Sequence, residues 1–298
     1  MAKLSHSLEY ALALTARKVA GTLSPERADA FAVRLGNLVH TVYGRRRRVA
    51  ADNLRRALGD SLSEVEQAAI VRRVFQNMAR SIIEMSRFDQ LRPEGARRII
   101  VGEGIEHVEE ARRRGTGALI CTAHFGNWEL LGAWFAAMGH PMHLLVGIQH
   151  NPHIDRMLSQ FRQAMGVELI PATVGARGIL KALKANHVVG VAADQHAGAG
   201  LPIEFFGRRA YAARGPATFT AKVGAPLIPY LMRRERFDRH VVMAGAPLTP
   251  AGSGDPQRDI DDMTIALNKF YEDTIRLYPD QWMWTHRRWK SIEKESNL

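Results

Sequence analysis

The segment Gly117-Ala-Leu-Ile-Cys-Thr122 is followed, after Ala123, by His124-Phe-Gly-Asn-Trp-Glu129 and then by an apolar stretch that ends at Met138. The first six residues have the short, continuous apolar pattern of a strand that is buried on both faces. Because such strands belong to parallel sheets covered by helices, this stretch predicts an α/β fold. Ligand-binding and catalytic groups collect at the carboxyl ends of these strands, where His124 stands.

Strand and helix patterns alternate along the rest of the chain. Further strands are expected at 142–148, 188–193, 227–232 and 240–244. Helices are expected at 127–138, 151–165, 178–185, 215–223 and 259–277. Residues 99–298 are therefore predicted to form one compact α/β core with a mixed, mostly parallel sheet flanked by helices.

Residues 1–98 have helical patterns and are predicted to form an N-terminal extension of this core. Ser24 directly precedes Pro25. This pair predicts a helix that is capped by Ser24 and has Pro25 at its first position. Ser61 and Glu64 have capping-box spacing, which predicts another helix start. One apolar helical face is formed by Leu4, Leu8, Leu12, Thr15, Val19 and Leu23. This face either packs on the fold or lies on a membrane surface, and both interpretations stay open.

The composition of the 298-residue chain limits the classes of partner and site. The single cysteine, Cys121, excludes a disulfide framework and is expected to be buried rather than nucleophilic. The net charge of +11 attracts anions. Part of the positive charge is concentrated in two arginine runs, Arg45–Arg48 and Arg55-Arg56. No nucleic-acid recognition motif or strong zinc-ligand spacing accompanies these residues. No run reaches the roughly 18 apolar residues of a spanning helix.

His124 and Glu129 are candidates for acid–base chemistry. Five residues apart in one helix, they would point about 140° from each other. They can pair only if His124 lies in the loop and Glu129 in the first helical turn. Glu129 would then fix the imidazole tautomer, and the other ring nitrogen would take a proton from a hydroxyl substrate. A purely structural hydrogen bond is the alternative interpretation.

The string His124-Phe-Gly-Asn-Trp-Glu129 resembles the HxxxxD/E signature of glycerolipid-type acyltransferases. With Asn127 and Trp128 it resembles more closely the late lipid A acyltransferase family, the lauroyl and myristoyl transferases. Further similar blocks follow in that family's order, over Asn151–Gly166 with Arg162, Val191–Gln195, Phe205–Gly207, Gly215–Ala217 and Trp282–Lys290. The similarity extends over about residues 5 to 290.

The resemblance implies an O-acyltransferase of lipid A biosynthesis that uses an acyl thioester of acyl carrier protein or coenzyme A. It implies His124 as the general base and Glu129 as its partner. Substrate-binding or oxyanion roles are implied for Arg162, Asp194, Gln195 and Asn127. Neither a cofactor nor a metal is expected. The implied partners are acyl carrier protein, a glycolipid acceptor and the anionic membrane surface.

The implied location is the cytoplasmic face of the cell inner membrane, with peripheral or N-terminal attachment. Many members of that family begin with a transmembrane helix that this sequence does not display, so the mode of attachment stays open. The acceptor could instead be a lysophospholipid, an ornithine lipid or a mannosylated lipid, and a non-catalytic membrane-associated binding protein is a third hypothesis. An acyl tunnel wall or ordinary core is expected at Leu130, Leu131, Trp134 and Phe135.

Overall fold

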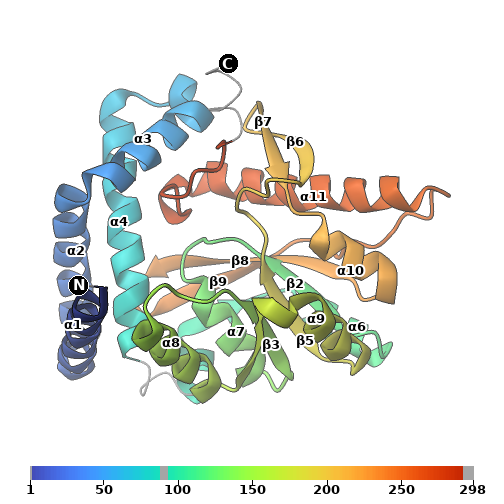
Figure 1. Cartoon of the computed structure of the whole chain (residues 1–298), viewed down its shortest axis with the longest axis horizontal. Coiled ribbons are helices and arrows are strands. Elements are labelled where there is room, and N and C mark those ends of the chain that lie inside the picture. Colours follow the sequence, from blue (N-terminus) through green and yellow to red (C-terminus); the bar gives the residue numbers. More distant parts are fainter. Residues whose placement is uncertain (1, 88–92, 291–298) are drawn as a thin grey trace.

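A seven-stranded sheet forms the centre of the computed structural model, which describes residues 2–87 and 93–290 (Figure 1). Its strand order is β1-β9-β8-β2-β5-β3-β4. The strands span Ile100–Gly102 (β1), Ala118–Thr122 (β2), Met142–Val146 (β3), Val167–Pro171 (β4), Val188–Ala192 (β5), Leu227–Arg236 (β8) and Arg239–Ala244 (β9). Only the β8–β9 pairing is antiparallel, so the predicted mixed, mostly parallel sheet is confirmed.

Helices cover both faces of this sheet and continue beside it at the N-terminal end of the chain (Figure 1). The N-terminal helices are α1 (Ala2–Thr22), α2 (Pro25–Val42), α3 (Gly44–Leu58) and α4 (Glu64–Ser86). The helices of the core are α5 (Pro93–Ile99), α6 (Ile105–Arg113), α7 (Trp128–Ala137), α8 (Pro152–Ala164), α9 (Gly175–Lys184), α10 (Gly215–Val223) and α11 (Pro256–Leu277). A separate hairpin that the sequence patterns did not predict is formed by β6 (Leu201–Phe205) and β7 (Arg208–Ala212).

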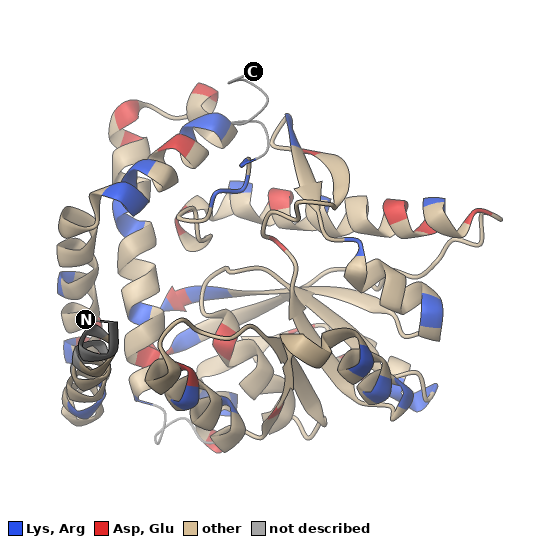
Figure 2. Ribbon diagram, viewed as in Figure 1, with Lys and Arg blue, Asp and Glu red and all other residues tan. Residues whose placement is uncertain are grey.

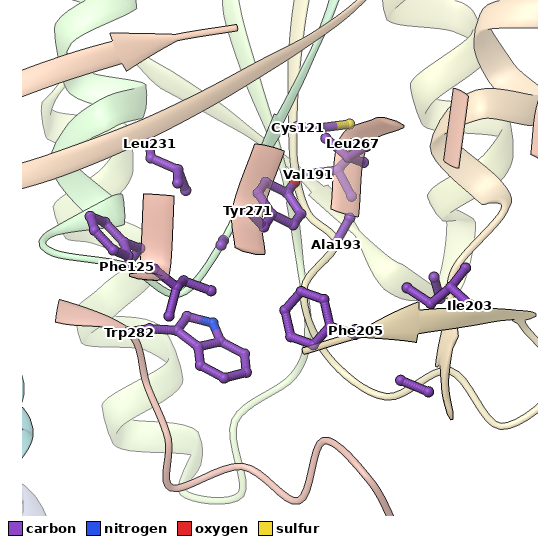
Figure 3. Close-up of a cluster of buried hydrophobic side chains, with 14 of the residues drawn as sticks. Cys121, Phe125, Val191, Ala193, Ile203, Phe205, Leu231, Leu267, Tyr271 and Trp282 are labelled. Carbon is purple, nitrogen blue, oxygen red and sulfur yellow. The ribbon is translucent and has the colours of Figure 1, made fainter. Parts of the chain in front are cut away.

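Strand β2 lies at the middle of the sheet and is buried along its whole length. Its alternate side chains enter two different hydrophobic cores, because neighbouring residues of a strand point to opposite faces. Leu119 and Cys121 pack with α9, α10 and α11, whereas Ala118 and Ile120 pack with α5, α6 and α7. Figure 3 shows part of the first core, where Cys121 lies near Leu267 of α11. This arrangement explains the unbroken apolar pattern of the strand.

Two of the N-terminal helices, α2 and α4, begin at capping serines, one of which differs from the prediction. Ser24 caps α2 and accepts a hydrogen bond from the Arg27 amide, as predicted. The capping box at the start of α4 is formed by Ser63 and Glu66 rather than by Ser61 and Glu64. Both pairs have the same spacing, but a short 3-10 turn over Gly59–Ser61 delays the helix by two residues.

Helix α1 packs against α4 and α8, and its Tyr10 ring stacks on His153 of α8. Ala20 is fully buried there, whereas Thr15, Val19 and Leu14 are exposed. The predicted apolar face therefore points away from the fold at Thr15 and Val19, and the side chains of Leu4, Leu8 and Leu12 lie outside the described residues. Within residues 2–87 and 93–290, no helix combines the length and the hydropathy needed to cross a membrane.

Replacement of the capping serine tests where α4 begins. Ser63→Ala removes the acceptor of the Glu66 amide and should lower the free energy of unfolding by about 1 kcal/mol. Ser61→Ala is the matched control, because Ser61 belongs to the preceding 3-10 turn. Urea unfolding of both variants measures the difference, and a larger loss for Ser61→Ala would place the capping box at the originally predicted position.

Candidate active site

The loop that joins β2 to α7 carries His124 at the carboxyl end of the central strand. Gly126 has φ of +57°, and a Cβ atom there would lie 1.8 Å from the Met232 carbonyl oxygen, so only glycine fits. The Gly126 amide donates to the Gln281 carbonyl oxygen at 2.9 Å. The Met283 amide donates to the His124 carbonyl oxygen at 2.9 Å. The loop is thus held between β8 and the segment that follows α11.

Asp194 is the hydrogen-bond partner of the His124 ring. The His124 Nδ1 and Asp194 Oδ1 atoms are 2.8 Å apart. Thr122 of β2 pairs with Ala192 of β5, so His124 and Asp194 each stand two residues beyond a paired position on adjacent parallel strands. This register brings the two side chains together at one edge of the sheet. The prediction that Glu129 occupies this position is therefore wrong.

The second oxygen of Asp194 is also fully engaged. Asp194 Oδ2 accepts from the His124 backbone amide at 3.0 Å and from the Trp282 indole at 2.7 Å. In Figure 3, Trp282 lies between Phe125 and Phe205, and the Phe205 ring packs edge-on against the indole. The carboxylate is only 3% exposed, so these donors replace the water that burial removes. They fix Asp194 in the orientation that faces His124.

The charges in this pair determine its protonation. Burial lowers the pKa of His124, but the negative charges of Asp194 and Glu129 raise it more, so the net shift is upward. Burial raises the pKa of Asp194, yet His124 and Trp282 lower it to below its ordinary value. Asp194 is thus ionised near neutral pH and accepts the Nδ1 proton of His124. No hydrogen-bond partner of Nε2 is found among the described residues, so this nitrogen is available as a base.

Glu129 forms an ion pair with Arg162 at the start of α7. Its two carboxylate oxygens accept from Arg162 Nε at 2.9 Å and from Nη2 at 2.7 Å. Both side chains are about nine-tenths buried. Burial lowers the pKa of Arg162, but the Glu129 carboxylate raises it further, so the guanidinium stays charged. Glu129 therefore influences His124 by its charge across space, and Arg162 is a paired cation rather than a free one.

Asn127 lies inside the protein behind the His124 loop, a position that gives no support to its predicted contact with substrate. It is fully buried, and its Nδ2 donates to Glu84 Oε2 at 2.7 Å. Glu84 forms a buried ion pair with Arg234, whose Nη2 is 2.7 Å from the same oxygen. Ser81 accepts from Arg234 and donates to the Gly126 carbonyl oxygen at 3.0 Å. This group anchors the back of the His124 loop.

A cavity of about 480 Å³ comes close to His124 through Gln195, the neighbour of Asp194, although His124 itself does not line it. Gln195 lines it, with Nε2 3.4 Å from His124 Nδ1, and His286 lines the same end. Its walls come mainly from α2, α3 and α4, through Leu35, Val39, Tyr43, Arg46, Phe75, Met78, Ala79 and Ile82. A polar end and apolar walls suit a substrate with a reactive group and a hydrocarbon chain.

Two other groups of candidates belong to the core. Leu130, Leu131, Trp134 and Phe135 of α7 are buried against the sheet, which matches the ordinary-core alternative rather than the tunnel wall. Cys121 is fully buried, as expected, and burial raises the pKa of its thiol, which excludes a ready thiolate nucleophile. Reasoning from sequence missed Glu84, Arg234 and the indole bond of Trp282. Of these residues, only Trp282 was marked by the sequence, because it begins one of the blocks that resemble the acyltransferase family.

Comparisons with known proteins were made for the whole chain. A family model described as bacterial lipid A biosynthesis acyltransferase matches residues 2–291. A phosphatidylinositol mannoside acyltransferase of Mycobacterium tuberculosis H37Rv is 26% identical over 199 residues, which cover 65% of this chain and 61% of that protein. The chain thus spans less than two thirds of that relative's length.

Two relatives from Escherichia coli K12 match over more of their length. A lipid A biosynthesis lauroyltransferase is 25% identical over 260 residues, or 86% of this chain and 83% of that protein. A lipid A biosynthesis palmitoleoyltransferase is 23% identical over 265 residues, or 87% of this chain and 83% of that protein. The similarity therefore includes both the N-terminal helices and the sheet that carries His124.

The buried ion pair behind the loop should contribute strongly to stability. Arg234→Met leaves the Glu84 carboxylate without its main partner and should lower the free energy of unfolding by about 3–5 kcal/mol. Arg239→Met is the control, because its pair with Glu235 is 42% exposed and is worth at most about 1 kcal/mol. Guanidinium unfolding measures both losses. Equal losses would contradict the anchoring role of the buried pair.

Titration of His124 tests the Asp194 pair. Two carboxylates raise the pKa of His124, and the effect of Asp194 is larger than that of Glu129. Asp194→Asn removes the larger effect, so the pKa of His124 should fall. In the wild type, protonated His124 stabilises the folded state, because its pKa there is above the ordinary value of 6.5 for histidine. This stabilisation is complete below pH 6.5 and is lost as the pH rises through the folded-state pKa of His124. NMR of the His124 ring follows the titration. Glu129→Gln should lower the same pKa less, and the reverse order would contradict this pairing.

Proposed function

Because the chain belongs to the bacterial lipid A biosynthesis acyltransferase family, we propose that it transfers a fatty acyl chain from a thioester to a lipid hydroxyl group. The observation that carries this proposal is the His124–Asp194 pair, which Gln195 connects to the polar end of an apolar cavity. The pair supplies a general base, and the cavity supplies a site for hydrocarbon. A fatty chain gains about 0.8 kcal/mol for each buried methylene group, so an apolar wall selects long acyl donors.

The proposed reaction proceeds by direct attack of the acceptor hydroxyl. His124 Nε2 takes the hydroxyl proton as the oxygen forms a bond to the thioester carbonyl carbon. The carbon–sulfur bond then breaks, and the thiolate leaves and receives the proton from the imidazolium. Asp194 holds Nδ1–H and stabilises the positive charge that the ring acquires. The products are an ester and a free thiol, with no covalent acyl-enzyme.

Charge develops on the carbonyl oxygen during this attack and needs a hydrogen-bond donor. We assign this role to the Gln195 amide, which lines the cavity beside His124. Loss of one such donor typically lowers kcat by about 10²–10³-fold. We assign an electrostatic role to the Glu129–Arg162 pair. The charge of Glu129 raises the pKa of His124, and Arg162 holds Glu129 in place. Neither step requires a metal or a cofactor.

We propose that the acyl carrier and the membrane surface both bind to the basic side of the N-terminal helices. A groove of about 1120 Å³ runs between α2, α3 and α4 and is lined by Arg47, Arg48, Arg55, Arg72 and Arg208. Arg46, one residue earlier, lines the cavity beside His124. Figure 2 shows Lys and Arg positions along α3. This adjacency supports a thioester on acyl carrier protein, with coenzyme A as the alternative donor, at the cytoplasmic face of the inner membrane.

The acceptor we propose is a hydroxyl group of a lipid A precursor. The match to the Escherichia coli lauroyltransferase supports it, because that match covers most of both chains. A mannosylated lipid is the second candidate, favoured by the similarity to the mycobacterial phosphatidylinositol mannoside acyltransferase. Both candidates use the same chemistry at His124 and differ only in the headgroup that carries the hydroxyl.

A transfer assay tests the proposal and the two acceptors together. Lauroyl or myristoyl acyl carrier protein is offered with a tetra-acylated lipid A precursor or with phosphatidylinositol mannoside, and mass spectrometry detects the product. His124→Ala should lower kcat by about 10²–10⁴-fold, the usual contribution of a general base, while the variant remains folded. Asp194→Asn should lower kcat as well. Full activity in folded His124→Ala would refute the mechanism.

Wild-type protein that is folded and transfers no acyl group to either lipid would favour a non-catalytic, membrane-associated binding protein. Transfer to the mannoside alone would replace the proposed acceptor with the second candidate. Release of free thiol, followed with a colorimetric thiol reagent, separates these outcomes from simple binding. The same assay with lauroyl coenzyme A decides between the two donors.

A further inference from the structure

A second apolar cavity lies between α1, α4 and α8. Its volume of about 510 Å³ falls within the range of roughly 300–1,000 Å³ that ligand sites occupy. Apolar side chains dominate its lining, which comprises Ala13, Arg17, Ile82, Met85, Ser86, Ile154, Met157, Leu158, Gln160, Phe161 and Ala164. Within α8 no residue is fully buried, although its apolar side chains face the other two helices. The apolar face of α8 is thus only half covered by protein.

This second cavity adjoins the cavity beside His124. Ile82 of α4 lines both cavities, and its side chain is 56% exposed. The cavity beside His124 ends at Gln195, whereas the second cavity begins on the other side of Ile82. Arg162 follows Phe161 on α8 and pairs with Glu129, so a charged group also flanks the second cavity. A polar border next to an apolar cavity suits an amphiphilic molecule.

We propose that the second cavity binds a hydrocarbon chain of the acceptor lipid, while the cavity beside His124 binds the acyl chain of the donor. This inference rests on the proposed function, in which two lipid chains meet at one histidine. The donor chain continues directly from the reacting carbonyl carbon, so it fits the cavity that begins at Gln195. The chains of the acceptor lie further from its reacting hydroxyl and fit the cavity beyond Ile82.

Cavity-filling substitutions distinguish the two chains. Ala164→Trp fills the second cavity and Val39→Trp fills the first, whereas Gln163→Trp is the matched control, because Gln163 is an exposed residue of α8 that lines neither cavity. Ala164→Trp should raise the KM of the acceptor about tenfold, which corresponds to roughly two buried methylene groups, and leave the KM of the donor unchanged. Val39→Trp should raise the KM of the donor and shift the preference to shorter acyl chains.

Two kinetic results would overturn the proposal. A shift of donor chain-length preference in Ala164→Trp would assign the second cavity to the donor. Unchanged KM values for both substrates in folded Ala164→Trp would leave the cavity without a role in binding. Circular dichroism and thermal unfolding check that each tryptophan variant is folded before these kinetics are interpreted.

Binding of a non-reacting probe tests the cavities without catalysis. Equilibrium dialysis with radiolabelled lauric acid should find two sites in the wild type and in Gln163→Trp. Ala164→Trp and Val39→Trp should each retain one site, and the double variant none. A wild type with one site that Ala164→Trp leaves intact would overturn the proposal. Absence of transfer to any lipid refutes the proposed function instead, and the dialysis result remains a separate measurement.

Discussion

The buried carboxylate of Asp194 is the interaction on which the site depends. A carboxylate that is 3% exposed is costly to bury unless each oxygen finds hydrogen-bond donors. The His124 ring, the His124 amide and the Trp282 indole supply them. These donors come from the β2–α7 loop and from the segment after α11, whereas the carboxylate belongs to the end of β5. One satisfied charge therefore joins three parts of the chain and orients the imidazole at the same time.

Much of the fold could be predicted from the sequence, because β2 and its neighbours have apolar patterns that only a covered parallel sheet explains. The partner of His124 could not, because the contact joins residues 70 positions apart. It depends on the pairing of Thr122 with Ala192, and strand register is a property of the assembled sheet. Local spacing favoured Glu129, which is close to His124 in sequence but bonds to Arg162 instead. The β6–β7 hairpin escaped prediction, since its short strands carry mixed polar residues.

The residues of the short motif divide into those that face the reaction and those that hold the loop. His124 lies next to Gln195 of the cavity wall, and Glu129 acts on His124 by its charge. Gly126 and Asn127 instead anchor the loop. Gly126 lies against the backbone of Met232, and Asn127 donates a hydrogen bond to Glu84. Glu84 and Arg234 lie far from the motif in sequence, and buried charges of this kind have no local pattern that separates them from exposed ones. Their pairing with each other is what makes their burial tolerable.

Helix α4 contributes both to the support of the His124 loop and to the walls of the two apolar cavities. Ser81 and Glu84 face inward and hold Gly126 and Asn127, whereas Ile82 faces outward between the two apolar cavities. These residues lie within about one turn of a helix, whose regular geometry fixes their relative positions. In the proposed complex, one helix would therefore set the distance between the imidazole and the hydrocarbon chains on either side of Ile82. A reaction between two long, flexible lipids gains from such a reference, because their own conformational freedom would otherwise oppose alignment of the reacting atoms.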